Sequence, residues 1–457
     1  MSRLYPFPSS ESEPRVSVAS NDMILMDFNE ERIRKRRRNS EEKEEEENLP
    51  NHVDSLPQEV AFDIISRLPI KSLIQFRFVC KSWENLSYDP NLVNLHLSKA
   101  LKGNLCLIFH CDFPIKNFLY FVEFSPNSYE KEQKLGKFEI PFSNRMAEFN
   151  VIGSCNGLLC LVNSLLDETL YIYNPFTSKF KELPKPTPVY QDQIVMYGFG
   201  FHPITNQYKV IKITYYPNAL NLNSIHRPGR GILLLHRHSN SSVQVFCVGK
   251  SSNQWRNIGK IPYKLQKNCS PVLLNGRLHW TANQVRNQGQ HNPGVVRIVS
   301  FDLSDELFRE IESPELGTHV YIRRDYHISS LGGCLCIVVP LRGTSDCSSL
   351  DIWVMKEYDM KESWVKEFNI GAFCPNFISQ QDLYKSRGVW RSILTSRMIR
   401  VLCLLKNGDI LLQYKGGTLV SYNPKNGLFN NITFPNMPKF FQTVPHIGSL
   451  NWVDSSS

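Results

Sequence analysis

The sequence predicts a mainly β protein in which a short all-α module near the N-terminus precedes a β-propeller of about six blades. Apolar residues at helical spacing are concentrated between Ser55 and Leu97. From about residue 100 onward, short apolar runs separated by turn residues replace that spacing. Asn-Gly or Gly-Gly pairs recur between such runs, at intervals that fit a repeated unit of roughly 50 to 60 residues. We expect a tail over 1–50, the helical module over 51–98 and the propeller over 99–457.

Composition places the chain among soluble globular proteins. Its 457 residues are 42% hydrophobic and 21% charged, which is enough apolar material for a real core. We find no run of about 18 apolar residues and no secretory signal, so we expect no membrane span and an intracellular protein of the nucleus, the cytoplasm or both. The twelve cysteines are scattered, and we expect reduced thiols that pack as small hydrophobes.

The first 50 residues have the composition of a disordered tail, because two opposed charge blocks leave little to pack. An acidic block from Glu41 to Glu47 follows a basic one. The basic block is typical either of a nuclear-import signal or of a solvated run paired loosely with the glutamates. The net charge of +9 is mild, so we do not expect nucleic acid as the partner. The candidate import residues are Arg32, Arg34, Lys35, Arg36, Arg37 and Arg38.

Two helices are expected in the module. Ser55 and Gln58 have capping-box spacing, with Pro57 in the first turn, and Pro69 should end the first helix at Leu68. A second helix fits the spacing of the apolar residues from Leu73 to Trp83. Apolar residues cover two faces, and a unit of roughly 40 residues buries too little surface to stand alone. One face should therefore meet the rest of the chain or a partner helix.

Five hairpin-rich units follow, and the pairs Asn156-Gly157, Asn275-Gly276, Gly332-Gly333 and Asn407-Gly408 predict type I′-like turns in them. An aromatic residue follows a second turn in each unit, and we expect these aromatics to pack between blades. The aromatics are Phe180, Trp255, Phe308, Trp364 and Phe429. The five units span 150–185, 195–260, 270–315, 326–370 and 400–435.

Strand-like flanks lie at both ends of the propeller region, over 104–142 and 441–453. A ring of sheets must close or leave edges exposed. Pairing the two flanks in one composite blade closes it and gives six blades. Insertions at 214–231 and 283–294 are then expected to be loops on the rim.

The helical module resembles the F-box. The resemblance rests on Leu56-Pro57, Ile64-Ile65, Arg67-Leu68-Pro69, Lys71-Ser72-Leu73, Val79-Cys80-Lys81, Trp83, Asp89-Pro90 and His96, with Leu92 where the family often has Phe. It implies docking to a Skp-type adaptor and, through it, to a cullin. The residues that carry this contact by position are Leu56, Pro57, Ile64, Leu68, Pro69, Val79, Cys80 and Trp83.

The region after the module resembles the F-box-associated interaction domain of plant F-box proteins, a relative of kelch repeats. The matching phrases are GSCNGLLCLVN, LYIYNPFTSKFKELP, YGFGFHPITNQYKVIKI and LNGRLHW. The resemblance implies that the propeller recruits a target protein to an SCF ubiquitin ligase. It identifies neither the target nor the loops that bind it.

No catalytic motif stands out, and we expect a non-catalytic adaptor without cofactor or metal. Gly198-Phe199-Gly200 lacks the third glycine of a dinucleotide site, and His236 and His238 lack further metal ligands in sequence. Two alternatives stay open: a propeller hydrolase or glycan-modifying enzyme with an unrelated helical leader, and a nucleic-acid-binding propeller with a basic tail. The first predicts converging carboxylates or histidines at the channel, and the second a steep salt dependence of binding.

Overall fold

Contacts group residues Pro50–Ser457 into one compact unit that contains all the helices and strands described below. The computed structural model describes residues 57–102, 105–111, 118–123, 135–146, 149–163, 169–188, 193–216, 240–249, 254–266, 270–283, 297–316, 326–341, 349–373, 399–414, 417–435, 437 and 441–453. The basic run Arg32–Arg38, the pair His236 and His238, and nearly all of the two long insertions lie outside these residues.

The described residues of the helical module form four helices: α2 (Gln58–Ile65), α3 (Ile70–Phe76), α4 (Lys81–Leu86) and α5 (Pro90–Leu101). The predicted first helix is too long at both ends. Pro57 is the N-cap, with a ψ of 137° outside the helical range, and α2 ends at Ile65, before Leu68. Ser55 lies outside the described residues, so the capping box stays a prediction.

The predicted second helix is in fact two. Helix α3 stops at Phe76, and Cys80 is extended, with φ −157° and ψ 169°, before α4 begins. The rings of Phe76 and Trp83 nevertheless stack at 3.7 Å across the break. The regular spacing of Phe76, Cys80 and Trp83 thus comes from two helices that fold against each other.

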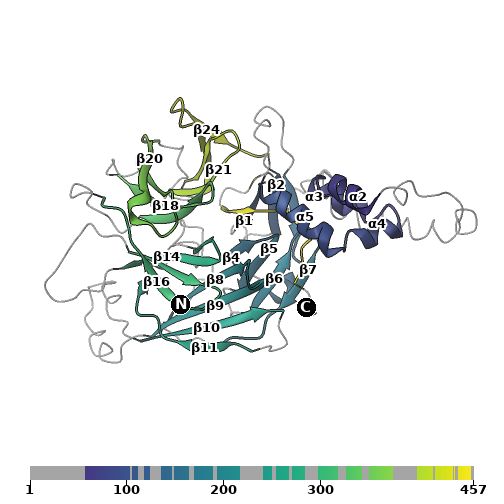
Figure 1. The fold of residues 1–457 in the computed structure, drawn as a ribbon, viewed down its shortest axis with the longest axis horizontal. Helices are drawn as coiled ribbons and strands as arrows, with labels where there is room; N and C mark the ends of the chain where they lie inside the picture. Colours follow the sequence, from purple (N-terminus) through teal and green to yellow (C-terminus); the bar gives the residue numbers. More distant parts are fainter. Residues whose placement is uncertain are drawn as a thin grey trace, which may run out of the picture. The chain divides into compact units, whose positions relative to one another are not determined.

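The strands form six sheets, which confirms the predicted six-bladed propeller (Figure 1). Blade 1 contains β4 (Phe149–Cys155), β5 (Leu158–Asn163), β6 (Leu170–Asn174) and β7 (Lys179–Glu182), and blade 2 contains β8 (Ile194–His202), β9 (Gln207–Tyr216), β10 (Asn240–Val248) and β11 (Arg256–Gly259). Blade 3 contains β12 (Lys264–Leu265), β13 (Val272–Leu274), β14 (Arg277–Asn283), β15 (Arg297–Asp302) and β16 (Phe308–Ile311), with β12 and β13 both paired to β14. Blade 4 contains β17 (His327–Leu331), β18 (Cys334–Pro340), β19 (Leu350–Met355) and β20 (Trp364–Ile370), and blade 5 contains β21 (Arg400–Leu404), β22 (Ile410–Gln413), β23 (Leu419–Tyr422) and β24 (Phe429–Ile432).

The sixth sheet is the predicted composite blade. It places β25 (Phe441–His446) beside β1 (Cys106–Cys111), followed by β2 (Phe118–Glu123) and β3 (Gly136–Glu139). The antiparallel register runs from Cys106 opposite His446 to Cys111 opposite Phe441. Strands β25, β4, β8, β14, β17 and β21 contact one another in that order, and β21 contacts β25 in turn, so the sheets form a closed ring.

Three of the four predicted type I′-like turns have the expected backbone. Both residues have positive φ in Asn156-Gly157, Asn275-Gly276 and Gly332-Gly333. The fourth prediction is wrong in detail, because only Gly408 has positive φ and its N–H donates to the carbonyl of Leu405 at 2.9 Å. One extra residue in that loop makes a wider turn than a two-residue hairpin.

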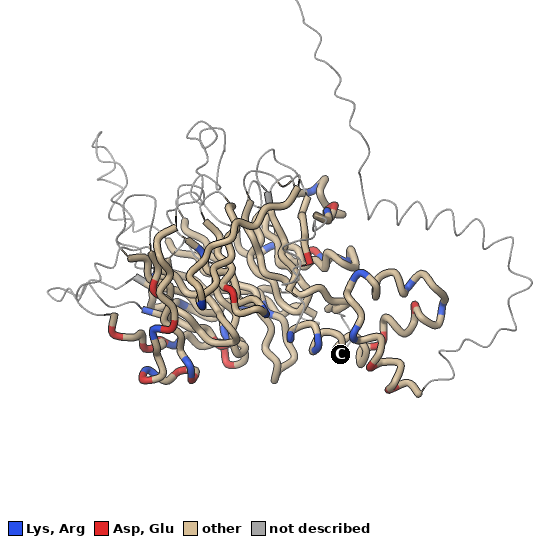
Figure 2. Tube along the Cα trace, turned by 90° about the horizontal axis from the view of Figure 1, so that it is seen from above, with Lys and Arg blue, Asp and Glu red and all other residues tan. Residues whose placement is uncertain are grey.

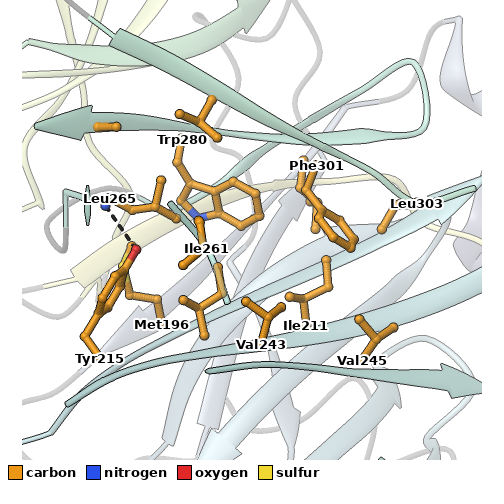
Figure 3. Packing of buried hydrophobic residues seen from close by; sticks show 14 residues of the cluster. Met196, Ile211, Tyr215, Val243, Val245, Ile261, Leu265, Trp280, Phe301 and Leu303 are labelled. Carbon is orange, nitrogen blue, oxygen red and sulfur yellow. Dashed lines mark hydrogen bonds between the residues drawn. The ribbon is translucent and has the colours of Figure 1, made fainter. Parts of the chain in front are cut away.

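We call the packing layer between two neighbouring blades a seam. Hydrophobic clusters fill the seams between blades 1 and 2, 2 and 3, 3 and 4, and 4 and 5, and the seam between blade 5 and the composite blade. Between blades 2 and 3 the fully buried Trp280 and Phe301 meet Ile211 and Val243 (Figure 3). Gly198 and Gly200 of β8 face this seam, and a Cβ on Gly198 would lie 2.8 Å from a methyl carbon of Leu278. The glycine pair thus serves close packing of sheets.

Two of the predicted inter-blade aromatics repeat one contact. The indole N–H of Trp255 in blade 2 donates to the carbonyl of Pro184, which follows blade 1, at 2.7 Å. The indole N–H of Trp364 in blade 4 donates to the carbonyl of Glu312, which follows blade 3, at 2.9 Å. Both rings also pack in the corresponding seams. This supports the structural interpretation of these positions.

Candidate docking site

From here on we call residues 57–102 the module; they run from Pro57 to the residue that caps α5. Helix α5 is joined to the end of α2 by hydrogen bonds from one lysine. Lys99 of α5 donates to the Asp63 carbonyl at 3.1 Å, to Asp63 Oδ1 at 2.6 Å and to Ser66 Oγ at 2.7 Å. A cation at the end of α2 also suits the negative end of the helix dipole. The hydrogen bonds from Lys99 and then from Arg67 lower the pKa of Asp63. Leu92, the position that departs from the family pattern, is fully buried, as expected of an apolar anchor.

A second set of contacts fixes the link between α3 and α4. Arg77 Nε donates to Ser87 Oγ at 3.0 Å, and its guanidinium lies 4.6 Å from the centre of the Tyr88 ring. Arg77 therefore holds the start of this link against the residues that follow α4. Elsewhere in the module, His96 of α5 approaches the carbonyl of Leu68, between α2 and α3, at 3.2 Å.

The module also has exposed apolar side chains. Val60 and Ile64 on α2 are 45% and 53% exposed, and Phe78 and Val79 after α3 are 44% and 63% exposed. Single exposed apolar residues are normal, but four within twenty residues make this segment a candidate for contact with a partner. We call Val60, Ile64, Phe78 and Val79 the docking face.

The predicted adaptor-binding residues fall into two groups. Pro57, Ile64, Pro69 and Val79 are exposed, and Leu68, Cys80 and Trp83 are half-buried. Leu56 lies outside the described residues. The ring of Trp83 stacks on that of the buried Phe76, so part of Trp83 belongs to the core of the module. The sequence-based list omitted Val60 and Phe78, although their apolar side chains were visible in the sequence; their exposure was not.

Within the described residues, no group of three or more His, Cys, Asp or Glu could hold a metal ion. The buried histidines of the propeller lie on strands and join neighbouring segments. His279 Nε2 lies 2.7 Å from the Tyr358 hydroxyl, across the seam between blades 3 and 4. His446 Nδ1 lies 2.9 Å from Ser154 Oγ, between the composite blade and blade 1. Burial lowers the pKa of His279 to about 4 and that of His446 to about 3, so both are neutral at physiological pH.

Charged residues of both signs lie close together on the described chain (Figure 2). Asp302 illustrates this: Arg277 Nε donates to it at 2.9 Å, and Arg309 lies at 3.9 Å. In this cluster the arginines are paired with carboxylates, so they do not form the positively charged patch that a nucleic-acid-binding site needs. None of the helices in the described ranges has the length and apolar character needed to cross a bilayer.

The fold and the site define a six-bladed propeller that carries a helical docking module. The profile of the F-box domain matches residues 53–95, and that of the F-box associated beta propeller domain matches residues 105–391. The chain belongs to this family of F-box proteins. The two matches agree with the fold-level resemblance read from the sequence.

Two relatives from Arabidopsis thaliana illustrate the family. F-box protein At3g07870 is 43% identical over 408 residues, which cover 88% of this chain and 93% of the relative. F-box protein CPR1 is 27% identical over 335 residues, covering 69% of this chain and 73% of the relative. Among solved structures, one titled "Structure of YjhT" aligns with 72% of this chain and 94% of its own at 10% identity and a TM-score of 0.37, a likeness too distant to bear on function. The family supports, in general terms, a role in substrate recognition for an SCF ubiquitin ligase.

Proposed function

We propose that this chain is the substrate-recognition subunit of an SCF ubiquitin ligase. The module docks a Skp-type adaptor, which links it to a cullin, and the propeller recruits a target protein. The adaptor contact uses the docking face together with Leu56, Pro57, Leu68, Pro69, Cys80 and Trp83. The protein itself supplies position rather than chemistry, because holding two reactants together can account for much of a rate enhancement.

One observation carries this proposal: the docking face is exposed, while α5 packs against the rest of the module. Lys99 and the buried Leu92 hold α5 against the rest of the module. By contrast, Ile64 is 53% exposed and Val79 is 63% exposed. An apolar helix face of this kind fits a groove or helix of a partner. We propose that the protein works inside the cell, where such a partner is found.

The test is a binding measurement with a purified Skp-type adaptor and matched surface substitutions. Ile64→Asp places a charge in the docking face and should abolish binding, because an unpaired charge would be buried in the complex. Ile204→Asp is the control: Ile204 is 89% exposed on a propeller turn and makes no part of the docking face. It should bind as the wild type does.

Circular dichroism on both variants shows that the substitutions leave the fold intact. Wild-type affinity in a folded Ile64→Asp variant contradicts the proposal. Equal loss in the Ile204→Asp variant contradicts it as well, because binding would then not depend on the docking face.

A further inference from the structure

The segment that follows β25 crosses from the composite blade over blade 1 to blade 2. We call residues 447–453 the strap. Asn174 Nδ2, at the turn after β6, donates to the carbonyls of Ser449 and Asn451 at 2.9 and 2.7 Å. Asn451 Nδ2 in turn contacts the carbonyl of Asn156 at 3.1 Å and the hydroxyl of Tyr208 at 2.7 Å. The strap is therefore fixed by side-chain amides at both of the blades it crosses.

The strap also forms part of the surface on which the module rests. Gly448 lies so close to α3 that a Cβ there would be 2.7 Å from Cγ2 of Ile70 and 3.2 Å from Cβ of the same residue. The same Cβ would lie 3.2 Å from Cε2 of the Phe176 ring. Gly448 has no positive φ, so the need for glycine here is one of space rather than backbone conformation.

Next to Ile70, Lys71 contacts the composite blade. Its ammonium lies 3.5 Å from Glu123 Oε2 and 4.9 Å from the centre of the Phe121 ring. On blade 1, the Lys179 ammonium lies 5.1 Å from the ring of Tyr88 in the module. These contacts are partly exposed and individually weak, whereas Ile70 is buried and packs closely against Gly448.

We propose that the strap is a conformational device that couples closure of the propeller to the placement of the module. Strand β25 completes the ring, and the residues directly after it complete the seat of α3. The module is held in one orientation only when the chain has closed the ring. This inference rests on contacts within the chain and not on adaptor binding, so the two can fail separately.

The test uses a zero-length carbodiimide crosslink between Lys71 and Glu123, detected by mass spectrometry on the full chain. Wild type should give the crosslink. Gly448→Val should reduce it to background, because the added atoms meet the base of Ile70 and displace α3. Gly371→Val is the matched control, since a Cβ at Gly371 meets nothing within 4 Å and the φ there is not left-handed.

A second arm separates displacement from unfolding. Gly448→Ala should lower the crosslink yield, and adding Ile70→Ala should restore it, because the smaller side chain makes room for the new methyl group. Thermal unfolding should show cooperative transitions in every variant. An undiminished crosslink in Gly448→Val, or no rescue in the double variant, overturns the proposal. Adaptor binding by the folded Gly448→Val variant should stay at the wild-type level, since the docking face is not part of the seat.

Discussion

The module and the propeller treat their apolar residues in opposite ways. In the propeller, large side chains such as Trp280 and Phe301 are fully buried in the seams, and exposed apolar residues such as Ile204 and Leu428 belong to the turns of separate blades. In the module, Ile64 and Val79 are exposed within one short segment. Apolar residues of the same types therefore stabilise the propeller where they are buried and form the proposed docking face where they are exposed.

Trp280→Ala should have the largest effect on stability. The side chain is fully buried in the seam between blades 2 and 3, and removing it leaves a cavity. Truncations of this kind cost about 3–5 kcal/mol. Urea unfolding followed by circular dichroism should show this loss, whereas Ile64→Ala should change stability by no more than about 0.5 kcal/mol. Equal losses in the two variants would remove the contrast between seam and docking face.

Asn174→Ala should have an intermediate effect and sharpens the comparison within the propeller. Asn174 and Asn423 occupy the same kind of turn, and each Oδ1 accepts backbone N–H bonds from the residues that follow. Only Asn174 also donates to the strap. Leaving buried carbonyls without a donor costs about 1–3 kcal/mol.

Asn423→Ala, which loses only the turn contacts, is the control for this prediction. The difference between the two variants in urea unfolding measures the strap contacts. If both variants lose the same stability, the strap hydrogen bonds contribute nothing measurable.

Acid should weaken the propeller before it weakens the module. Burial lowers the pKa of His110, His327 and His446 to about 3 and that of His279 to about 4, against about 6.5 when unfolded. Below pH 6.5 the unfolded chain binds protons that the folded chain excludes, so stability falls as the pH is lowered. It is unaffected by these groups above that value. Each histidine contributes at most about 1.4 kcal/mol per pH unit.

Urea unfolding at a series of pH values between 7 and 5 measures the slope. Hydrogen exchange in the same range should show protection lost in the strands before the helices, because the described module holds one buried histidine, His96, whose pKa burial also lowers. A flat stability profile, or helices that open first, contradicts the prediction.

Much of the fold followed from the sequence because turns and strand alternation are local signals. The hairpin pairs such as Asn156-Gly157 located the blades, and the need to avoid open edges located the composite blade. The break at Cys80 was missed, because Phe76, Cys80 and Trp83 keep helical spacing even though the chain turns between them. Spacing alone does not distinguish one helix from two that pack together.

The candidate site was predicted in kind but not in detail. Motif resemblance pointed to Ile64 and Val79, which are exposed, and also to Trp83, which the module partly buries. Apolar residues cover more than one face of α2, so the sequence could not say which face the module keeps for itself. That choice depends on α5, whose Lys99 and Leu92 engage one side and leave the other to solvent.

The pairing of β25 with β1 has a consequence for folding rate. The two strands are joined through almost the whole propeller, so their contact has one of the largest sequence separations in the molecule. Bringing such distant segments together carries a high loop-closure entropy before any contact rewards it, and domains dominated by contacts of this kind fold slowly. Until that step, the inner edge of β1 has unpaired backbone groups and can pair with other chains. Recovery of native protein on refolding should therefore fall steeply as protein concentration rises, since the slow last pairing competes with association of the open ring.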